Sequence, residues 1–332
     1  MLKVVADESA IRRHQRQFAR SLRAAAPEKI PVKIGHPGAS EKANVAWSES
    51  LGIWFFSRKI AGSRYWNGFG VGRPESGDNV AITCEINFPL YGIDRRTGGA
   101  FAQDRSGRTF VVHRGKLGGG RKGIGKSLFE NRYRGVWKTM DDDGEETTVA
   151  VIGVLQSPRF ARQIAQFVRK IARIKEAAAA PSPQAELSFD ERCVREDLIG
   201  ERHCEPKSET GAECDHGLII RDLAEALKKC GLQTVNDGHR DLLIRDRADR
   251  IRAVFQVLTE TTLPELHAGA TRLLLNGLGF PENPLLILVL PEPPESAPRE
   301  RLKRLNIDLL NYQWAEDRAV FPHLDGLLPQ VR

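Results

Sequence analysis

The sequence predicts a two-domain α+β protein: a β-rich basic domain over residues 1–175, a linker over 176–190 and an α/β domain over 191–332. Three observations lead to this prediction. Short apolar runs separated by Gly, Pro, Asp and Asn fill residues 45–155. The segment AAAAPSPQAEL changes composition abruptly and carries two prolines, as linkers do. Beyond it, helical and strand-like runs alternate, and 332 residues suffice for two separate cores.

The first domain is expected to begin with an amphipathic helix over 8–26. Ile11, Phe18 and Leu22 share one face of this helix and arginines occupy the rest, so we expect the apolar face to pack into the core. Strands, mostly antiparallel, are expected over four apolar runs: 52–60, 79–90, 108–115 and 147–155.

A second long amphipathic helix is predicted over 157–180. Its apolar face consists of five residues: Phe160, Ile164, Phe167, Val168 and Ile171. Six Lys and Arg residues, with no acidic residue before Glu176, occupy the other face. We expect that basic face either to lie against a nucleic acid or to cover the sheet.

The second domain has a regular succession of elements. A helix is predicted over 215–231, three strands over 233–235, 241–244 and 253–259, a helix over 264–279, and a buried strand over 285–292. A basic helix over 298–306 and a last strand over 307–314 complete it. The core order is therefore α-β-β-β-α-β.

Charge differs strongly between the two halves. Residues 1–175 contain 31 Lys and Arg against 16 Asp and Glu, a net charge of +15, whereas residues 176–332 carry −8. Residues 95–138 alone hold twelve basic and two acidic residues, a density typical of a surface that follows phosphates. We expect the first domain to bind nucleic acid, with DNA favoured, and the acidic second domain to contact a protein partner or a second copy of the chain.

The order of elements at 200–325 resembles that of the PD-(D/E)XK nucleases, the restriction-endonuclease-like proteins. Asp241 stands at the start of a strand, and the next strand reads AVFQVLTETT. In the family this second strand carries an acidic residue, a spacer and a lysine, which hold Mg²⁺ and orient the attacking water. Here those positions are Gln256 and Leu258, and Arg272 stands where a helical glutamine is usual. The resemblance implies a degenerate, inactive nuclease-like domain.

A rebuilt metal site is the alternative to degeneration. Asp237, Asp241 and Glu260, with His216 nearby in sequence, are the candidate ligands, although no lysine follows before Lys303. We therefore expect no cofactor, and Mg²⁺ only if this irregular site is an active nuclease.

A glycine-rich basic loop lies in the first domain. GRKGIGKS, from Gly120 to Ser127, fits the phosphate-cradling nucleotide-binding pattern, but no apolar strand runs directly into its first glycine. A loop that approaches a nucleic-acid backbone is favoured over ATP or GTP binding, with a plain flexible hairpin as the simpler alternative.

The stretch 85–126 also resembles a module in the N-terminal half of bacterial two-domain restriction or defence proteins. That resemblance implies contacts to phosphate or bases. The candidate residues within it are Arg95, Arg96, His113, Arg114, Lys116, Arg121, Lys122 and Lys126, and Arg132, shortly after the stretch, is a further candidate.

Aromatic residues and cysteines give weaker signals. Tyr65 and Trp66 are the aromatic candidates for base stacking, in a run where half or more should be core. The five cysteines, Cys84, Cys193, Cys204, Cys214 and Cys230, are odd in number and irregularly spaced, so we expect reduced thiols rather than disulfides or, with His203 and His216, a zinc site.

These expectations combine into one functional hypothesis. The chain is expected to be a cytoplasmic DNA-binding protein of a bacterial restriction or defence system, without a membrane span or signal peptide, that carries an inactive nuclease-like domain. An active metal-dependent nuclease and a non-enzymatic subunit that docks a partner remain the alternatives.

Overall fold

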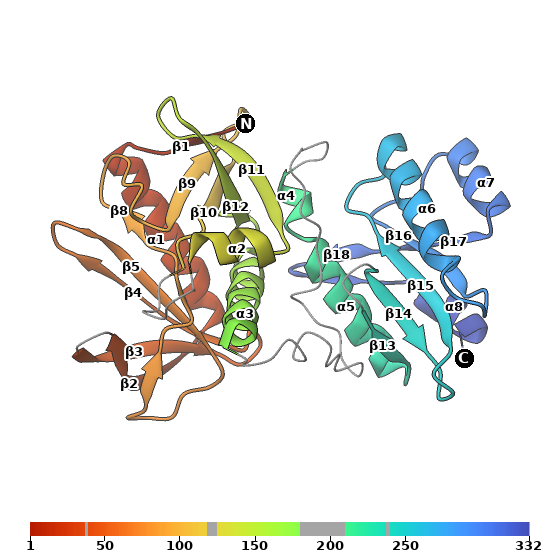
Figure 1. Cartoon of the computed structure of the whole chain (residues 1–332), viewed down its shortest axis with the longest axis horizontal. Helices are drawn as coiled ribbons and strands as arrows, with labels where there is room; N and C mark the ends of the chain where they lie inside the picture. The colour runs from red at the N-terminus through yellow and green to blue at the C-terminus, as the bar shows by residue number, and fades with distance from the viewer. Residues whose placement is uncertain (37–38, 118–124, 180–209, 237–239, 332) are drawn as a thin grey trace. The chain divides into compact units, whose positions relative to one another are not determined.

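The computed structural model describes residues 1–36, 39–117, 125–179, 210–236 and 240–331 (Figure 1). The described residues form two compact units, one that includes residues up to 179 and one that includes residues from 210 onward. Both units mix helices and strands, in agreement with the predicted α+β class. The linker was predicted to begin at residue 176, but helix α3 (Phe160–Ala179) continues to Ala179. The rest of the predicted linker, from 180, lies outside the described residues.

The first unit combines a small closed barrel with a seven-stranded sheet. The barrel order is β1 (Leu2–Val4), β11 (Val136–Asp141), β12 (Glu146–Val154), β10 (Thr109–His113) and β9 (Gly99–Gln103). The sheet order is β6 (Asn79–Ala81), β2 (Glu28–His36), β3 (Ala39–Ser48), β4 (Ile53–Ile60), β5 (Arg64–Val71) and β7 (Cys84–Glu85), and β8 (Phe88–Pro89) pairs with β5. Pairing is antiparallel except between β1 and β11 and between β2 and β6, so the predicted mostly antiparallel arrangement is confirmed.

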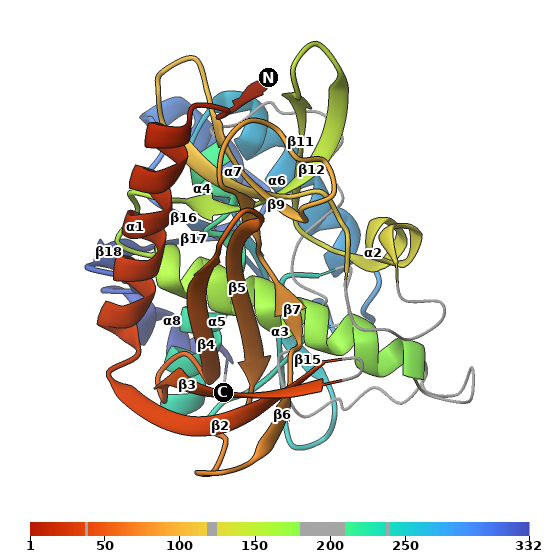
Figure 2. The ribbon, with the colours of Figure 1, turned by 90° about the vertical axis from the view of Figure 1, so that its left-hand side faces the viewer.

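Helix α1 (Glu8–Ala25) supplies one side of the main core of this unit. It begins where the Asp7 carboxylate accepts the Ala10 N–H at 2.8 Å, which satisfies one of the unpaired amides of the first turn. Ile11, Phe18 and Leu22 are at most 1% exposed, so the predicted apolar face is confirmed. Figure 2 shows α1 alongside the sheet and α3 crossing it.

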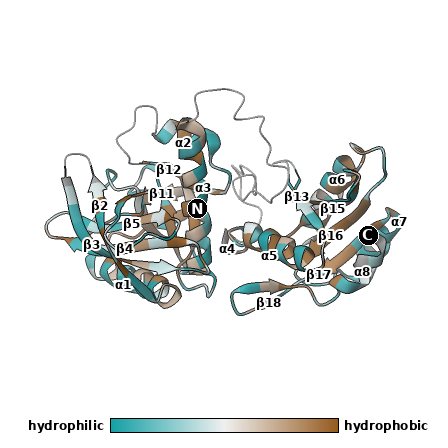
Figure 3. Cartoon of the chain, turned by 90° about the horizontal axis from the view of Figure 1, so that it is seen from below, coloured by the Kyte–Doolittle hydropathy of each residue, from teal (hydrophilic) through white to brown (hydrophobic). Residues whose placement is uncertain are grey.

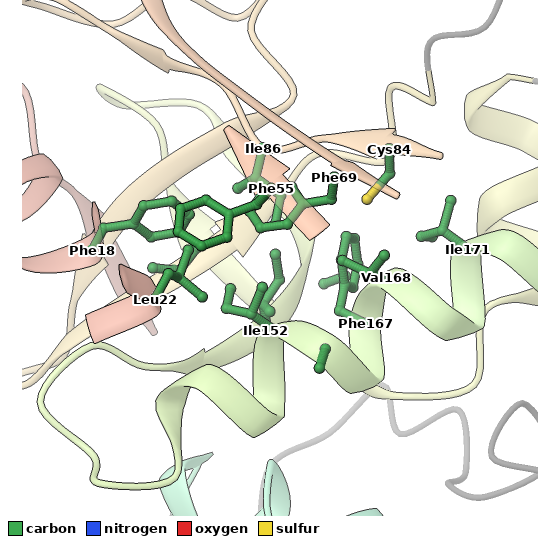
Figure 4. Close-up of a cluster of buried hydrophobic side chains, with 14 of the residues drawn as sticks. Phe18, Leu22, Phe55, Phe69, Cys84, Ile86, Ile152, Phe167, Val168 and Ile171 are labelled. Atoms are coloured by element: carbon green, nitrogen blue, oxygen red, sulfur yellow. The ribbon is translucent and has the colours of Figure 1, made fainter. Parts of the chain in front are cut away.

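Helix α3 supplies the other side of the core. Its predicted apolar residues Phe167, Val168 and Ile171 converge with Phe18 of α1 and Phe69 of β5 (Figure 4). Burial of each large side chain of this kind contributes about 1.5–3 kcal/mol, so these two helices and the sheet stabilise one another.

Of the two alternatives for the basic face of α3, packing against the rest of the unit is the one that Arg162 and Lys170 fit. Arg162 and Lys170 are each only 5% exposed, because the helix contacts α1, α2 (Lys126–Arg132) and the sheet on several sides. Lys170 donates to the Arg134 carbonyl oxygen, and its ammonium lies 5.7 Å from the centre of the Tyr133 ring. Lys170 therefore holds α3 to its neighbours and is unavailable to a phosphate.

A second apolar cluster covers the other face of the same sheet. Trp54, Phe56 and Trp66 are at most 6% exposed, and Trp54 and Phe56 of β4 stand opposite glycines of β5. A Cβ added to Gly70 would lie 2.2 Å from the Trp54 ring. The rings therefore occupy space that only glycine leaves open, and both faces of the sheet are buried at this point.

The second unit has a five-stranded sheet with helices on both faces. The strand order is β13 (Gln233–Val235), β14 (Leu242–Arg245), β15 (Ile251–Val257), β16 (Leu285–Leu290) and β17 (Ile307–Asn311). The pairs β13–β14 and β14–β15 are antiparallel, whereas β15–β16 and β16–β17 are parallel. A small hairpin of β18 (Gln313–Ala315) and β19 (Arg318–Val320) follows.

The faces of this sheet are covered by different helices. Residues of α5 (His216–Lys229) and α8 (Leu324–Val331) pack on one face, and residues of α6 (Leu263–Gly277) and α7 (Ser296–Arg304) pack on the other. Figure 3 shows brown, hydrophobic residues along the central strands and a largely teal α7. Helix α4 (Thr210–Glu213) precedes α5. The predicted order of helices and strands from 215 to 314 is confirmed. Within the described parts of the chain, no helix has both the length and the hydropathy needed to cross a bilayer.

Candidate nucleic-acid interface and nuclease-like site

The site that the sequence resemblance predicts centres on Asp241, which directly precedes β14. Its Oδ2 accepts hydrogen bonds from the Gln256 side-chain amide at 2.6 Å and from the Val257 N–H at 2.8 Å, both on β15. His216 Nε2, at the start of α5, lies 3.3 Å from the same oxygen. Three polar groups from two elements therefore converge on one carboxylate oxygen.

These contacts define what this site can do. Gln256 is 5% exposed and donates to Asp241, so at this position the chain has a hydrogen-bond donor where a Mg²⁺ site needs a second anionic oxygen. Leu258 is 4% exposed and belongs to the core under α6, in contact with the position of Gly269. Leu258 can neither hold a metal nor position a water, and Gln256 supplies no anionic oxygen to a metal.

The rebuilt metal site receives no support from the part of the chain that is described. Nowhere in it do three His, Cys, Asp or Glu side chains gather closely enough to hold a metal ion. Asp237 lies outside the described residues, and Glu260 follows β15 as a half-buried residue. Arg272, also half-buried, lies in the middle of α6. Asp241 and His216 are the members of the candidate set that the structure brings together.

A buried ion pair lies at the end of β10, a few residues before the glycine-rich segment in the sequence. Arg114, directly after β10, donates to both carboxylate oxygens of Asp142, at 2.9 and 3.2 Å, and to the Gly99 carbonyl oxygen at 3.3 Å. The two side chains are 7% and 2% exposed. Arg114 therefore joins β9 and β10 to the β11–β12 turn, and the expectation that it contacts phosphate is wrong because solvent hardly reaches it.

Arg95 and Lys116 extend this cluster to the surface. Arg95 donates to the Asp142 carbonyl oxygen at 2.6 Å and lies 3.5 Å from its carboxylate and 3.4 Å from that of Glu145. Lys116 donates to the carbonyl oxygen of Arg95. The Arg95 side chain keeps 47% of its surface in solvent and Lys116 is exposed, so these two cations are held in place at the surface.

His113 is a structural residue rather than a surface contact. It is completely buried between Phe129 and Phe167, and burial lowers the pKa of its imidazole from 6.5 to about 4. Nδ1 accepts the Gly115 N–H at 3.0 Å, so the neutral ring carries its proton on Nε2, which faces the Glu85 carbonyl oxygen at 3.2 Å. The prediction that His113 binds nucleic acid is therefore wrong.

The remaining basic candidates keep their access to solvent where they are described. Arg96 is exposed, and Lys126, with 52% of its side chain in solvent, lies 3.5 Å from Glu130 one turn further along α2. Arg132 ends α2 and is half-buried. Arg121 and Lys122 lie outside the described residues, as does most of the nucleotide-binding pattern, whose last residues begin the seven-residue α2.

The aromatic candidates do not form a stacking platform. Trp66 is 6% exposed. Its ring meets the Phe56 ring edge-on, with 4.7 Å between the ring centres, and the Arg58 guanidinium carbon lies 4.5 Å from the centre of the Trp66 ring. Arg58 is itself paired with Glu41. Tyr65, on the opposite face of β5, is half-buried against the main core. Packing within the second apolar cluster, which a run of aromatic residues in the sequence does not reveal, removes Trp66 from the surface.

The described cysteines are free thiols. Cys84 and Cys214 are buried and Cys230 is half-buried. Burial raises the pKa of the Cys84 thiol to about 12, so it remains protonated at neutral pH. Cys193, Cys204 and His203 lie outside the described residues.

Asp142 is the site residue that sequence reasoning missed. It stands in the middle of the acidic run 141–143, which directly follows the basic stretch 95–138. The available signal was an acidic run next to many basic residues, because a carboxylate that becomes buried there needs an arginine or lysine as its partner.

The chain matches no protein-family model, no curated protein and no solved structure at a significant level. Its function is therefore inferred from the residues and contacts described above.

Proposed function

We propose that this chain is a DNA-binding protein of a bacterial restriction or defence system, in which the second unit is nuclease-like but does not cleave. The first unit binds the phosphate backbone through the basic residues around its glycine-rich loop. The excess of 15 positive charges over residues 1–175 supports this role, since such charge attracts phosphates from a distance.

The observation that carries the proposal is the anchoring of Arg95 and Lys116. The buried Arg114–Asp142 pair joins β9 and β10 to the β11–β12 turn, and Arg95 and Lys116 are exposed beside this pair. Cations that are already held in place lose less conformational entropy on binding than free side chains do. A prearranged cationic surface of this kind suits a polyanion.

The environment of Asp241 supports the absence of cleavage. The site has one carboxylate, Asp241, beside the donor amide of Gln256 and the buried Leu258. It therefore lacks the second metal ligand and the ammonium group that cleavage by this family requires. We infer that the second unit serves instead as an interaction domain. Its net negative charge would repel bare DNA, so a protein is the partner that suits it.

Binding across a salt series tests the proposal. The full chain and its Arg121→Ala/Lys122→Ala variant are titrated with labelled double-stranded and single-stranded DNA, with Mg²⁺ or Mn²⁺ added to detect cleavage. We expect tight binding of intact DNA that weakens steeply with salt, and a salt slope that decreases by about 1 for each phosphate that the variant leaves unneutralised.

A matched control removes the same charge elsewhere. Arg299→Ala/Arg301→Ala on the exposed side of α7 should leave binding unchanged. Cleavage by the wild type that disappears in Asp241→Ala would overturn the inactive assignment, and a wild-type chain that binds neither form of DNA would overturn the proposed function itself.

A further inference from the structure

Helix α1 carries a row of arginines whose role the proposed function leaves open. Arg13, Arg16, Arg20 and Arg23 follow one another at spacings of three, four and three residues, so they lie on one face of the helix. All four are exposed. Ten residues of helix place about 15 Å between the first and the last.

These arginines form no ion pair with any residue that the structure places. Their neighbour Arg12 pairs with Glu8 at 2.8 Å, and Arg13 interacts with the capping carboxylate of Asp7 only through a longer-range electrostatic attraction. Like charges three or four residues apart destabilise a helix. The row therefore costs stability in the isolated chain, which is a reason to look for an anion that covers it.

We propose that this arginine row of α1 is a second phosphate-binding surface, which follows the backbone of the nucleic acid bound by the first unit. The inference rests on the proposed function and adds a site to it. One strand of a DNA duplex presents a phosphate about every 3.4 Å along its axis, so the row spans about four phosphates. A guanidinium group binds two phosphate oxygens at once, which suits arginine better than lysine at such a surface.

The opposite face of α1 argues against a lipid surface as the occupant. Basic amphipathic helices bind membranes by inserting an apolar face below the headgroups. Here Ile11, Phe18 and Leu22 are at most 1% exposed, because they form part of the core with α3 and the sheet. Because this apolar face is buried in the core, it cannot insert into a bilayer, and α1 presents only its cationic face to a partner.

The test uses the full chain and the variant Arg13→Gln/Arg16→Gln/Arg20→Gln. Glutamine keeps helix propensity, and removal of like charges relieves repulsion, so we expect an unchanged or higher Tm. In contrast, we expect affinity for labelled duplex DNA to fall roughly tenfold or more, and the slope of log K against log salt to fall by about 0.9 for each phosphate that is no longer neutralised.

Two further variants make the result specific. Arg299→Gln/Arg301→Gln/Arg304→Gln removes three charges from exposed positions of α7 and should retain the wild-type slope. Arg13→Lys/Arg16→Lys/Arg20→Lys keeps the charge and should retain most of the slope while losing part of the affinity. If the triple glutamine variant does not fold, Arg16→Gln alone should lower the slope by about 0.9.

The outcomes separate this inference from the proposed function. A wild-type chain that binds DNA, with an unchanged slope in the triple glutamine variant, would overturn the α1 site and leave the proposed function intact. Absence of any wild-type binding would overturn both. Binding to vesicles rich in phosphatidylserine that disappears in the triple variant, with DNA binding unaffected, would overturn the nucleic-acid assignment of the row in favour of a membrane.

Discussion

The guanidinium of Arg114 and the carboxylate of Asp142 face each other through two hydrogen bonds, of 2.9 and 3.2 Å, although 28 residues separate them in the chain. Both side chains are almost fully buried. A buried charge that loses its partner retains its desolvation penalty, so this pair should be sensitive to removal of either member.

Asp142→Asn is expected to lower the unfolding free energy by about 3–5 kcal/mol, because it leaves the Arg114 guanidinium without a counter-charge. Urea denaturation followed by tryptophan fluorescence measures this, since four of the five tryptophans (Trp47, Trp54, Trp66 and Trp137) lie in the first unit. The control is Arg73→Gln, which breaks an exposed pair with Glu28 and should cost less than about 1 kcal/mol. Equal losses in the two variants would contradict the buried character of the pair.

Stability should fall as the pH is lowered from about 6.5 to about 4. The folded state holds the pKa of His113 near 4 through burial, whereas an unfolded histidine has a pKa of about 6.5. The unfolded state therefore takes up a proton first as the pH falls, so the stability present above pH 6.5 is progressively lost. The pKa difference corresponds to about 3 kcal/mol.

His113→Gln provides the comparison for this pH dependence. The variant can be less stable at every pH, but its stability should change less between pH 6.5 and 4 than that of the wild type. His14, whose pKa burial also lowers, adds to the wild-type slope in the same direction. A variant with the full wild-type slope would show that His113 is not the group that titrates.

Gln256→Glu should turn the hydrogen bond to Asp241 into a repulsion. The two groups now meet at 2.6 Å, and a second carboxylate there would lower stability by about 1–3 kcal/mol at neutral pH. Paired carboxylates attract Mg²⁺, so millimolar MgCl₂ should raise the Tm of this variant. Thermal unfolding with and without MgCl₂ checks both effects. Gln256→Leu, which removes the donor without adding charge, should show no response to MgCl₂.

Gly70→Ala should destabilise the first unit, because its Cβ would lie 2.2 Å from the Trp54 ring. We expect a loss of about 1–3 kcal/mol from the forced movement of a buried indole. Gly125→Ala, at the start of α2, meets no atom within 4 Å and serves as the control. Chemical denaturation of both variants decides the matter, and a neutral Gly70→Ala would mean that the indole can move without cost.

Much of the second unit could be predicted from sequence because its elements are local. Its strands are short apolar runs, and its first helix has a helical apolar period that ends at Gly231. The predicted elements from 215 to 314 are all present. The strands β2 and β3 were not predicted. Ile30, Val32 and Ile34 alternate as a strand requires, but Pro31 between them argues against a strand inside a sheet.

The candidate site was harder to predict for a different reason. Basic residues in sequence can be exposed contacts or buried structural partners, and only the fold distinguishes the two. Arg114 and Lys116 stand two residues apart, yet the first is buried on Asp142 and the second is exposed. The arginines of α1 have the spacing of any polar helix face, and only the surrounding elements show that they form no ion pair with a described carboxylate.

The core of the first unit joins the two ends of its sequence, with Phe18 of α1 beside Phe160 of α3 and strand β1 paired to β9 and β11. On the ribosome, α1 leaves the exit tunnel long before the helix it packs against has been made. At about 5–20 residues per second, roughly seven to thirty seconds of synthesis separate the two. During that interval Phe18 can pack on Phe69 and Phe88, but the side of the core that α3 completes stays open, so this core closes only near the end of the unit's synthesis.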